Sequence, residues 1–216
     1  MPIPNLSPTG IQLWNDGSAV AASVATLAAL KALASGHNAR THGNVVLVDA
    51  DGSEWVFHST SALTGDDILV ATPSAGSGRW LRKVGRTVLY LPFTYATADG
   101  ATLLTVPAGC VLKLDSAHWK ITTAMTGGSS SAIGVAATGA TTAGDILGGS
   151  GGDVEATLTA GTKAGTVGTL MDTDAELHAR ILVATNTVTF ERITSQFTAG
   201  AGSVGLVVDI LAHAGA

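Results

Sequence analysis

The residue types best suited to chemistry gather in the segment MDTDAELH, which contains Asp172, Asp174 and Glu176. Alternate residues of a strand share a face, so these carboxylates can converge. A convergent set can bind calcium, or supply the acid and its partner for glycoside hydrolysis. The glycosidase pair normally comes from different strands across a cleft, which disfavours hydrolysis here. We favour a polar turn before the next strand, with calcium binding as the open alternative.

Histidine and cysteine add little to this set. His37 and His42 flank Arg40 in GHNARTHG without a Cys, Asp or Glu between them, which makes them a poor pair of zinc ligands. A solvated loop is the favoured interpretation, and a histidine ring on an oligomer axis is the alternative. Cys110 is the only cysteine, and we expect it to be a small buried core residue with no base nearby to activate it.

Loop motifs that serve catalysis are missing from the sequence. The runs GGSSS and GGSGGD lack the Lys-Ser/Thr ending of a phosphate-binding loop, and no GxSxG elbow surrounds the serines at 129–131. The sequence therefore predicts no catalytic, metal-binding or cofactor-binding residues, no cofactor and no enzymatic activity.

Charge is scarce along the chain. Charged residues make up 12% of the 216 residues, about half the ~25% that is usual for soluble domains. A monomer with so few charges is poorly protected against association. We therefore expect a subunit whose surface is covered by copies of itself or by a larger assembly.

The sequence has no pattern typical of nucleic-acid or membrane binding. Its densest group of cations lies within RWLRKVGR, residues 79–86, in a chain of net charge −5, whereas nucleic-acid binding normally needs a basic face. No apolar run approaches the ~20 residues of a membrane span, and the N-terminus does not resemble a signal peptide. We expect a protein that is made in the cytoplasm and binds neither nucleic acid nor membrane.

Two N-terminal elements are expected. Prolines and glycines predict an extended arm over 1–17, with a frayed terminus as the alternative. Apolar residues at helical spacing predict a helix over 18–35, capped by Asp16 or Ser18 and ended by a left-handed Gly36. The arm can lie along a neighbouring protein through five apolar anchors: Ile3, Leu6, Ile11, Leu13 and Trp14.

Short apolar runs predict three strands after the helix, over 44–49, 53–58 and 67–72. A Gly-rich turn then leads into RWLR. Asp49 and Asp51, between the first two strands, lack the remaining ligands of a calcium loop, so an Asx-turn is favoured.

The order of these elements resembles the small N-terminal module of many bacteriophage tail-spike and fibre proteins. The resemblance covers residues 23–83, from TLAAL through VVLV, WVF and DDILVATP to the closing GRWLR. The chain has only ADGS where the family usually has a longer Gly-rich loop. The resemblance implies a helix followed by a short β-hairpin region, and we place this module at residues 18–85.

Residues 86–216 predict a separate β domain with Gly-rich turns at 160–165 and 199–203. Many short strands with no second helix favour an antiparallel β-sandwich that is jelly-roll-like. The predicted fold class is mainly β, with this sandwich preceded by a small α+β N-terminal module. The expected strands are 87–95, 101–106, 109–123, 131–136, 154–160, 178–184, 187–193 and 203–211. The tryptophans are expected in cores and not in a sugar platform: Trp14, Trp55, Trp80 and Trp119.

Residues 87–211 also resemble the β domain of phage capsid decoration, cement or head-fibre proteins. The resemblance rests on a compositional rhythm in ITTAMTGGSSSAIGVA, TAGDILGGSGGDV and FERITSQFTAGAGSVGLVVDIL. It implies a homotrimer bound to the major capsid protein on the capsid surface. Glu191 and Arg192 are adjacent in a strand, so one of them must point inward or to an interface. We expect a trimer contact there, with a solvated edge strand as the alternative.

These inferences predict a structural virion protein that decorates and stabilises a phage capsid by bridging capsomers as an oligomer. A tail-fibre or receptor-binding module that recognises host surface glycan is the alternative. A hydrolase that uses the carboxylates of residues 172–176 is the third hypothesis.

Overall fold

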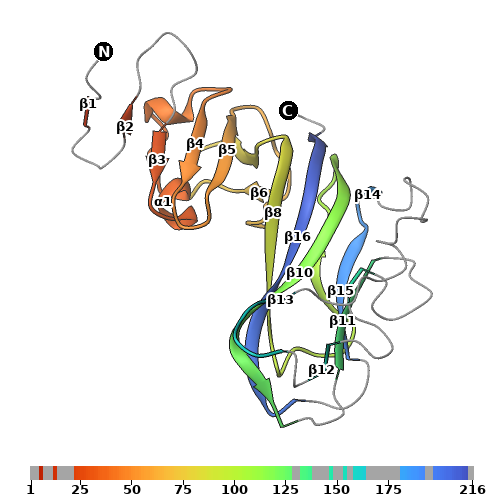
Figure 1. The fold of residues 1–216 in the computed structure, drawn as a ribbon. Coiled ribbons are helices and arrows are strands. Elements are labelled where there is room, and N and C mark those ends of the chain that lie inside the picture. The colour runs from red at the N-terminus through yellow and green to blue at the C-terminus, as the bar shows by residue number, and fades with distance from the viewer. Residues whose placement is uncertain are drawn as a thin grey trace. The chain divides into compact units, whose positions relative to one another are not determined.

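The structure is a computed structural model that describes residues 5–6, 12–13, 22–127, 132–137, 146–147, 153–154, 158–163, 181–192 and 197–213. It is mainly β with several antiparallel sheets, which confirms the predicted fold class (Figure 1). The chain divides into two units. Unit 1 comprises residues 1–84, 107–110 and 212–216, and unit 2 comprises residues 85–106 and 111–211.

Unit 1 is built on a five-stranded sheet of order β3-β4-β5-β7-β6. Only the β3–β4 pair is parallel. A short helix and a 3₁₀ turn accompany the sheet. The elements are β3 (Ala22–Val24), α1 (Leu27–Lys31), η1 (Asn38–Arg40), β4 (Val45–Val48), β5 (Ser53–His58), β6 (Val70–Ala71) and β7 (Arg79–Arg82). A separate two-stranded ladder joins β1 (Asn5–Leu6) to β2 (Gln12–Leu13).

The predicted helix over 18–35 is too long in its described part. The helix is α1, only five residues long, and the residues before it form β3. Thr26 is the N-cap. Its backbone is extended, so the helix begins after it, and its hydroxyl accepts the Ala29 N–H at 3.2 Å. Ser and Thr compete with helical hydrogen bonding through their side chains, and β4 offers β3 a full backbone partner. Gly36 is not left-handed, and the helix ends at Lys31 with Ala32 as its C-cap.

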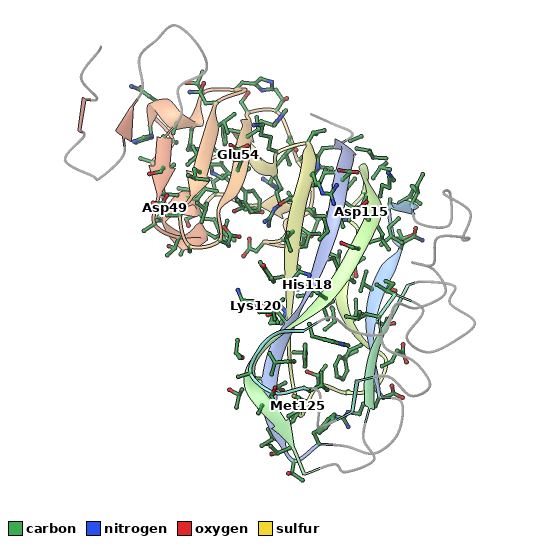
Figure 2. All side chains as sticks on the ribbon, in the orientation of Figure 1. Asp49, Glu54, Asp115, His118, Lys120 and Met125 are labelled. Carbon is green, nitrogen blue, oxygen red and sulfur yellow. The ribbon has the colours of Figure 1, made fainter. Side chains whose placement is uncertain are left out.

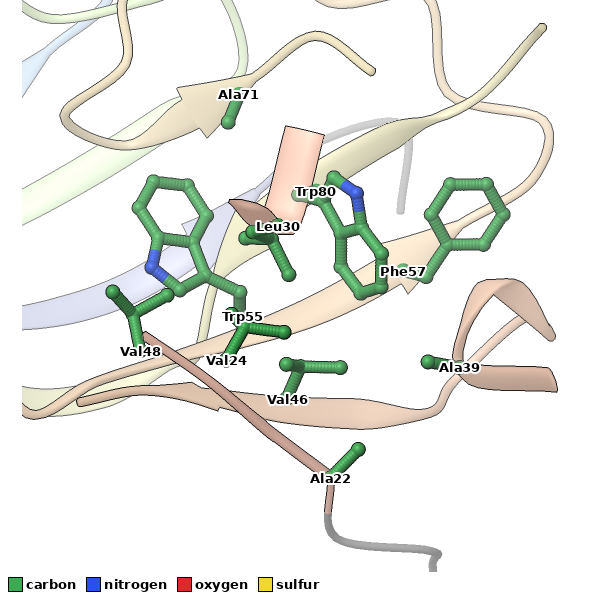
Figure 3. Packing of buried hydrophobic residues seen from close by; sticks show 10 residues of the cluster. All are labelled: Ala22, Val24, Leu30, Ala39, Val46, Val48, Trp55, Phe57, Ala71 and Trp80. Atoms are coloured by element: carbon green, nitrogen blue, oxygen red, sulfur yellow. The ribbon is translucent and has the colours of Figure 1, made fainter. Parts of the chain in front are cut away.

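The core of unit 1 lies between α1 and one face of the sheet (Figure 3). Leu30 is the fully buried residue of α1, and it packs against the cluster that contains Trp55 and Trp80. The rings of Phe57 and Trp80 pack at 4.9 Å between centroids. Both tryptophans are at most 1% exposed, which confirms their prediction as core residues.

Gly78 explains why a glycine opens the GRW segment. Its φ is +87°, a conformation that L side chains rarely adopt. A Cβ here would lie 2.6 Å from Phe57 Cζ and 2.8 Å from the carbonyl oxygen of His58. The turn can therefore approach β5 closely only with glycine at this position.

Two aspartates shape the turns of unit 1. Asp51 Oδ1 accepts the backbone N–H of Ser53 at 3.0 Å, which confirms the predicted Asx-turn. Asp66 Oδ1 accepts three successive backbone N–H groups, from residues 68 to 70. This second turn uses donors that the expected strand over 67–72 needs, so β6 is only Val70–Ala71.

Unit 2 contains two antiparallel sheets, ordered β13-β10-β16-β8 and β12-β11-β15-β9, and β14 also pairs with β10. The strands of the first sheet are β8 (Gly85–Thr94), β10 (Cys110–Thr126), β13 (Gly161–Lys163), β14 (Ile181–Val183) and β16 (Ala199–His213). Those of the second are β9 (Ala101–Thr105), β11 (Ala132–Ala137), β12 (Asp153–Val154) and β15 (Thr187–Arg192).

The two sheets of unit 2 meet through alternating apolar side chains. Leu89, Leu91 and Phe93 are buried along β8 while their neighbours are exposed or half-buried. Phe93 stacks on Phe190 of the other sheet at 5.3 Å and meets Trp119 edge-on at 5.5 Å. This packing is compatible with a β-sandwich, and the burial of Trp119 confirms its core prediction. The jelly-roll connectivity stays a prediction.

Two predicted turns are strands. Gly161–Lys163 is β13 and pairs with β10, and residues 199–203 begin β16. Gly200 allows this extension, because its φ is +128° and a Cβ there would lie 2.8 Å from the Cα of Met125. The expected domain ranges 1–17, 18–85 and 86–216 stay predictions about independent folding. Unit 1 also includes the segments 107–110 and 212–216, so one cut in the sequence cannot separate the two units.

Candidate functional site

Among the described residues, Cys110 lies beside a histidine, His213, and both belong to unit 1. The Cys110 Sγ lies 3.1 Å from His213 Nδ1, and His213 Nε2 lies 2.6 Å from the carbonyl oxygen of Arg82. The carbonyl can only accept, so Nε2 carries the hydrogen and Nδ1 of the neutral ring accepts from the thiol. The sequence analysis missed this base, because the residues are 103 positions apart and no local pattern joins them.

The electrostatics of this pair oppose nucleophilic catalysis. Cys110 is 1% exposed, and burial raises the pKa of its thiol to about 11. Burial also lowers the pKa of His213 below its ordinary 6.5, against the opposing effects of the Arg82 carbonyl and Asp66. A nucleophilic cysteine needs a lowered pKa and an accessible sulfur. The pair is therefore a buried structural contact, and the prediction of Cys110 as a core residue is confirmed.

A different kind of site lies on the outer face of the first sheet of unit 2. We define this outer face as the residues that alternate with the buried row of β8 and their neighbours on β16 and β10: Val88, Tyr90, His118, Lys120, Gly205 and Val207. Tyr90 lies opposite Gly205, and Val88 lies opposite Val207, in the β8–β16 register. Figure 2 shows His118 and Lys120 on the side of this sheet away from β11 and β15.

Gly205 has no side chain and so leaves room for the His118 ring at the centre of the outer face. A Cβ at Gly205 would lie 2.3 Å from His118 Nε2, so the imidazole lies directly over β16. The Tyr90 ring meets this imidazole edge-on at 6.1 Å, and Lys120 Nζ lies 4.3 Å from the Tyr90 ring centroid. Burial first, and Lys120 second, lower the pKa of His118. Tyr90 remains 40% exposed, which gives an aromatic surface with a single adjacent cation.

Two ion pairs lie on the same sheet. Arg86 forms an ion pair with Asp115, and Lys113 lies 3.9 Å from Asp209. The other cations of the 79–86 segment also have partners. The Arg79 guanidinium donates to the carbonyl oxygens of Leu63 and Gly78. Lys83 pairs with Glu54 at 2.6 Å. These cations are engaged by protein groups and form no free basic face among the described residues.

The structure brings two of the predicted arm residues near each other. Leu6 lies in β1 and Leu13 in β2, and the ladder pairs Leu6 with Gln12. The described residues of the arm therefore pair with each other in a short antiparallel ladder. Ile3, Ile11 and Trp14 lie outside the described residues.

Glu191 and Arg192 both have partners within the chain. Glu191 Oε1 accepts the hydroxyl of Thr189 at 2.9 Å. Arg192 donates its backbone N–H to Asp99 Oδ1, and its guanidinium donates to the carbonyl oxygens of residues 95 and 97. Both residues therefore have hydrogen-bond partners inside the folded chain. The trimer contact stays a prediction.

The carboxylates Asp172, Asp174 and Glu176 lie outside the described residues. Within the described part of the chain, no group of three or more His, Cys, Asp or Glu side chains is placed to hold a metal ion. His37 and His42 have other roles. The His37 Nδ1 accepts the Ala39 N–H, and the His42 ring meets His58 at 4.9 Å.

None of the helices among the described residues is long and apolar enough to span a membrane. Comparison with protein-family models, with curated proteins and with solved structures gave no match.

Proposed function

We propose that this protein is a structural virion component that decorates a phage capsid as an oligomer and bridges neighbouring capsomers. The observation that supports the proposal is the outer face of unit 2, where the exposed Tyr90 ring lies beside half-buried Val88 and Val207 on a chain with 12% charged residues. Exposed apolar surface on a weakly charged protein favours association with other protein.

The exposed apolar residues support an assembly role more broadly. Large hydrophobic side chains are exposed in both units. Tyr90 belongs to the outer face, and the others lie elsewhere on the two units. The exposed set is Leu47, Val84, Tyr90, Tyr95, Val183 and Leu211.

The role on a capsid follows from the sequence resemblance and from the N-terminal arm. In the proposal, residues 1–17 bind the major capsid protein, and the outer face joins copies of the chain. Each arm contributes modest binding free energy, but linked arms gain from effective concentration. An oligomer therefore binds a shell much more tightly than one arm does.

A binding experiment tests the capsid role. The purified chain is mixed with undecorated empty shells of the phage that carries this sequence, and occupancy is measured by electron microscopy. We expect the full chain to fill defined positions, and the chain lacking residues 1–17 to stay oligomeric but fail to bind. Full occupancy by the truncated chain would contradict the arm as anchor. Absence of the full chain from shells, with labelling at the tail, would favour the glycan-binding alternative.

Paired tyrosine variants test the outer face. Tyr90 and Tyr95 are each 40% exposed, but only Tyr90 belongs to the outer face. We expect Tyr90→Glu to dissociate the oligomer in sedimentation velocity while Tyr95→Glu leaves it intact. Equal behaviour of the two variants would reject the outer face as the subunit contact.

A further inference from the structure

Residues 107–110 and 212–216 reach unit 1 from distant parts of the sequence. His213 is the point where both are held. It is 8% exposed, and each ring nitrogen has one partner, Cys110 on one side and the Arg82 carbonyl on the other. The contact thus fastens the end of β16 and the start of β10 to β7.

The hydrogen bonds of this contact require a neutral imidazole. Since Nε2 donates to the carbonyl of Arg82 at 2.6 Å, Nδ1 must supply a lone pair to the thiol. A proton on Nδ1 would turn this acceptor into a donor that faces the Cys110 sulfur. Sulfur is a weak acceptor, so the Nδ1–H of the charged ring would be buried without a good hydrogen-bond partner.

The charged neighbours of His213 do not compensate for a buried imidazolium. On β7, the Arg82 guanidinium is a cation that lies over the Trp55 ring at 5.8 Å. On β5, His58 acts on His213 electrostatically, and its own pKa is lowered by burial, by His42 and by His213. The Asp51 carboxylate lies 3.7 Å from the Arg82 guanidinium. The Asp66 carboxylate favours the charged ring, and its Oδ1 accepts three backbone N–H groups. Burial outweighs this attraction, and the pKa of His213 is lowered.

We propose that the Cys110–His213–Arg82 contact is an acid-released latch: proton uptake at His213 Nδ1 opens it and frees residues 212–213 and Cys110 from β7. The rest of the fold keeps its secondary structure. Nothing in this latch depends on capsid binding, so it can fail or hold independently of the proposed function.

Cys110 is the chain's only cysteine, so its labelling reports on the latch in the unmodified full chain. The rate of reaction with 4,4′-dithiodipyridine is measured at about pH 7.5 and about pH 5, around the ordinary histidine pKa. Each rate is divided by the rate in denaturant at the same pH, which removes the effect of pH on thiol chemistry. Because a proton on His213 favours the open contact, we expect protection to fall by about tenfold or more in acid. Circular dichroism is expected to stay unchanged.

Constant protection between the two pH values would overturn the proposal. Loss of circular dichroism together with protection would also overturn it, because the change would then be global unfolding.

Glutamine variants identify the titrating group. Gln at position 213 can donate to the Arg82 carbonyl and accept from the thiol, but it does not titrate. His213→Gln is expected to lose the acid step, whereas His118→Gln in unit 2 keeps it. An unchanged acid step in His213→Gln would contradict the latch.

If His213→Gln leaves Cys110 unprotected at both pH values, an NMR titration of the wild-type chain tests the latch instead. We expect the His213 ring to titrate below 6.5, with the same midpoint as the loss of protection. A midpoint above 6.5, or one that differs from the labelling midpoint, would overturn the proposal.

Discussion

Unit 1 and unit 2 are both β-rich, but they are stabilised in different ways. The buried polar and charged residues of the described chain are Arg40, Ser53, Ser61, Arg82 and His213, and all lie in unit 1. The described core of unit 2 consists of aliphatic and aromatic side chains and Met125, and its ion pairs lie on partly exposed residues. Unit 1 therefore combines an apolar core with buried polar side chains, whereas the described core of unit 2 is apolar.

The buried arginines show what this difference means. Arg40 is 7% exposed and donates to the carbonyl oxygens of Leu33, Ala75 and Ser77, while it lies over the Phe57 ring at 5.0 Å. A small unit has little apolar surface to bury, and such a cation fixes the loops around it by direct contacts. Unit 2 has two facing sheets and needs no such device.

The largest effect is expected in unit 2. Trp119 is fully buried against Phe93, so Trp119→Ala should lower the free energy of unfolding by about 3–5 kcal/mol. Exposed Thr123, on the same strand, provides the control, and Thr123→Ala should change it by less than about 0.5 kcal/mol. Hydrogen exchange by mass spectrometry separates the two units. Equal loss of protection in both units would break the comparison.

The next effect tests the polar core of unit 1. Arg40→Met removes the donor for three carbonyl oxygens and should cost about 3 kcal/mol, because buried acceptors are left unsatisfied. Arg40→Lys keeps the charge but loses the planar fork, so it should recover only part of this loss. Chemical denaturation measures both variants. An Arg40→Met variant with the same free energy of unfolding as the wild type would show that unit 1 does not depend on its buried cation.

A smaller effect is expected at Gly78. Gly78→Ala combines a positive φ with a Cβ 2.6 Å from Phe57 Cζ and should cost about 2 kcal/mol. Gly36→Ala is the control, since nothing lies within 4 Å of a Cβ there and its φ is ordinary. Thermal unfolding compares the two. A Gly78→Ala variant that unfolds at the same temperature as Gly36→Ala would contradict the structural requirement for glycine in GRW.

The smallest effect is the pH dependence of stability. The pKa values of His58 and His213 in unit 1 and of His118 in unit 2 are lowered from 6.5 by burial. Below 6.5 the unfolded chain takes up protons that the folded chain does not, so stability falls as pH drops from 6.5 through the lowered pKa values. Denaturation at a series of pH values should show a flat region above 6.5. A rise in stability on acidification through this window would contradict the shifts.

The sequence predicted the strands better than the helix. Strands β4, β5 and β15 follow clear runs such as VVLV and TVTFER, whose branched and aromatic residues suit a sheet. Ala and Leu dominate residues 18–35, so the sequence predicts a helix that is too long. Residues 22–24 form β3 because they pair with β4, and this pairing depends on the tertiary fold. The Asx-turn at Asp51 is local, and the sequence predicted it correctly.

The candidate sites were much harder to predict. Cys110 meets His213 only because β10 and β16 bring their ends to the same place. The outer face depends on the register that sets Gly205 opposite Tyr90, and no single segment encodes that register. The contact expected at Glu191 and Arg192 stays a prediction, and the sequence does not show the hydroxyl and carbonyl oxygens that these residues meet in the folded chain.

Sedimentation equilibrium of the full chain over a wide concentration range tests the central claim most directly. A protein that covers its weakly charged surface with other copies should sediment as one defined oligomer, with a trimer as the specific expectation. The mass of a single chain at every concentration would contradict the account.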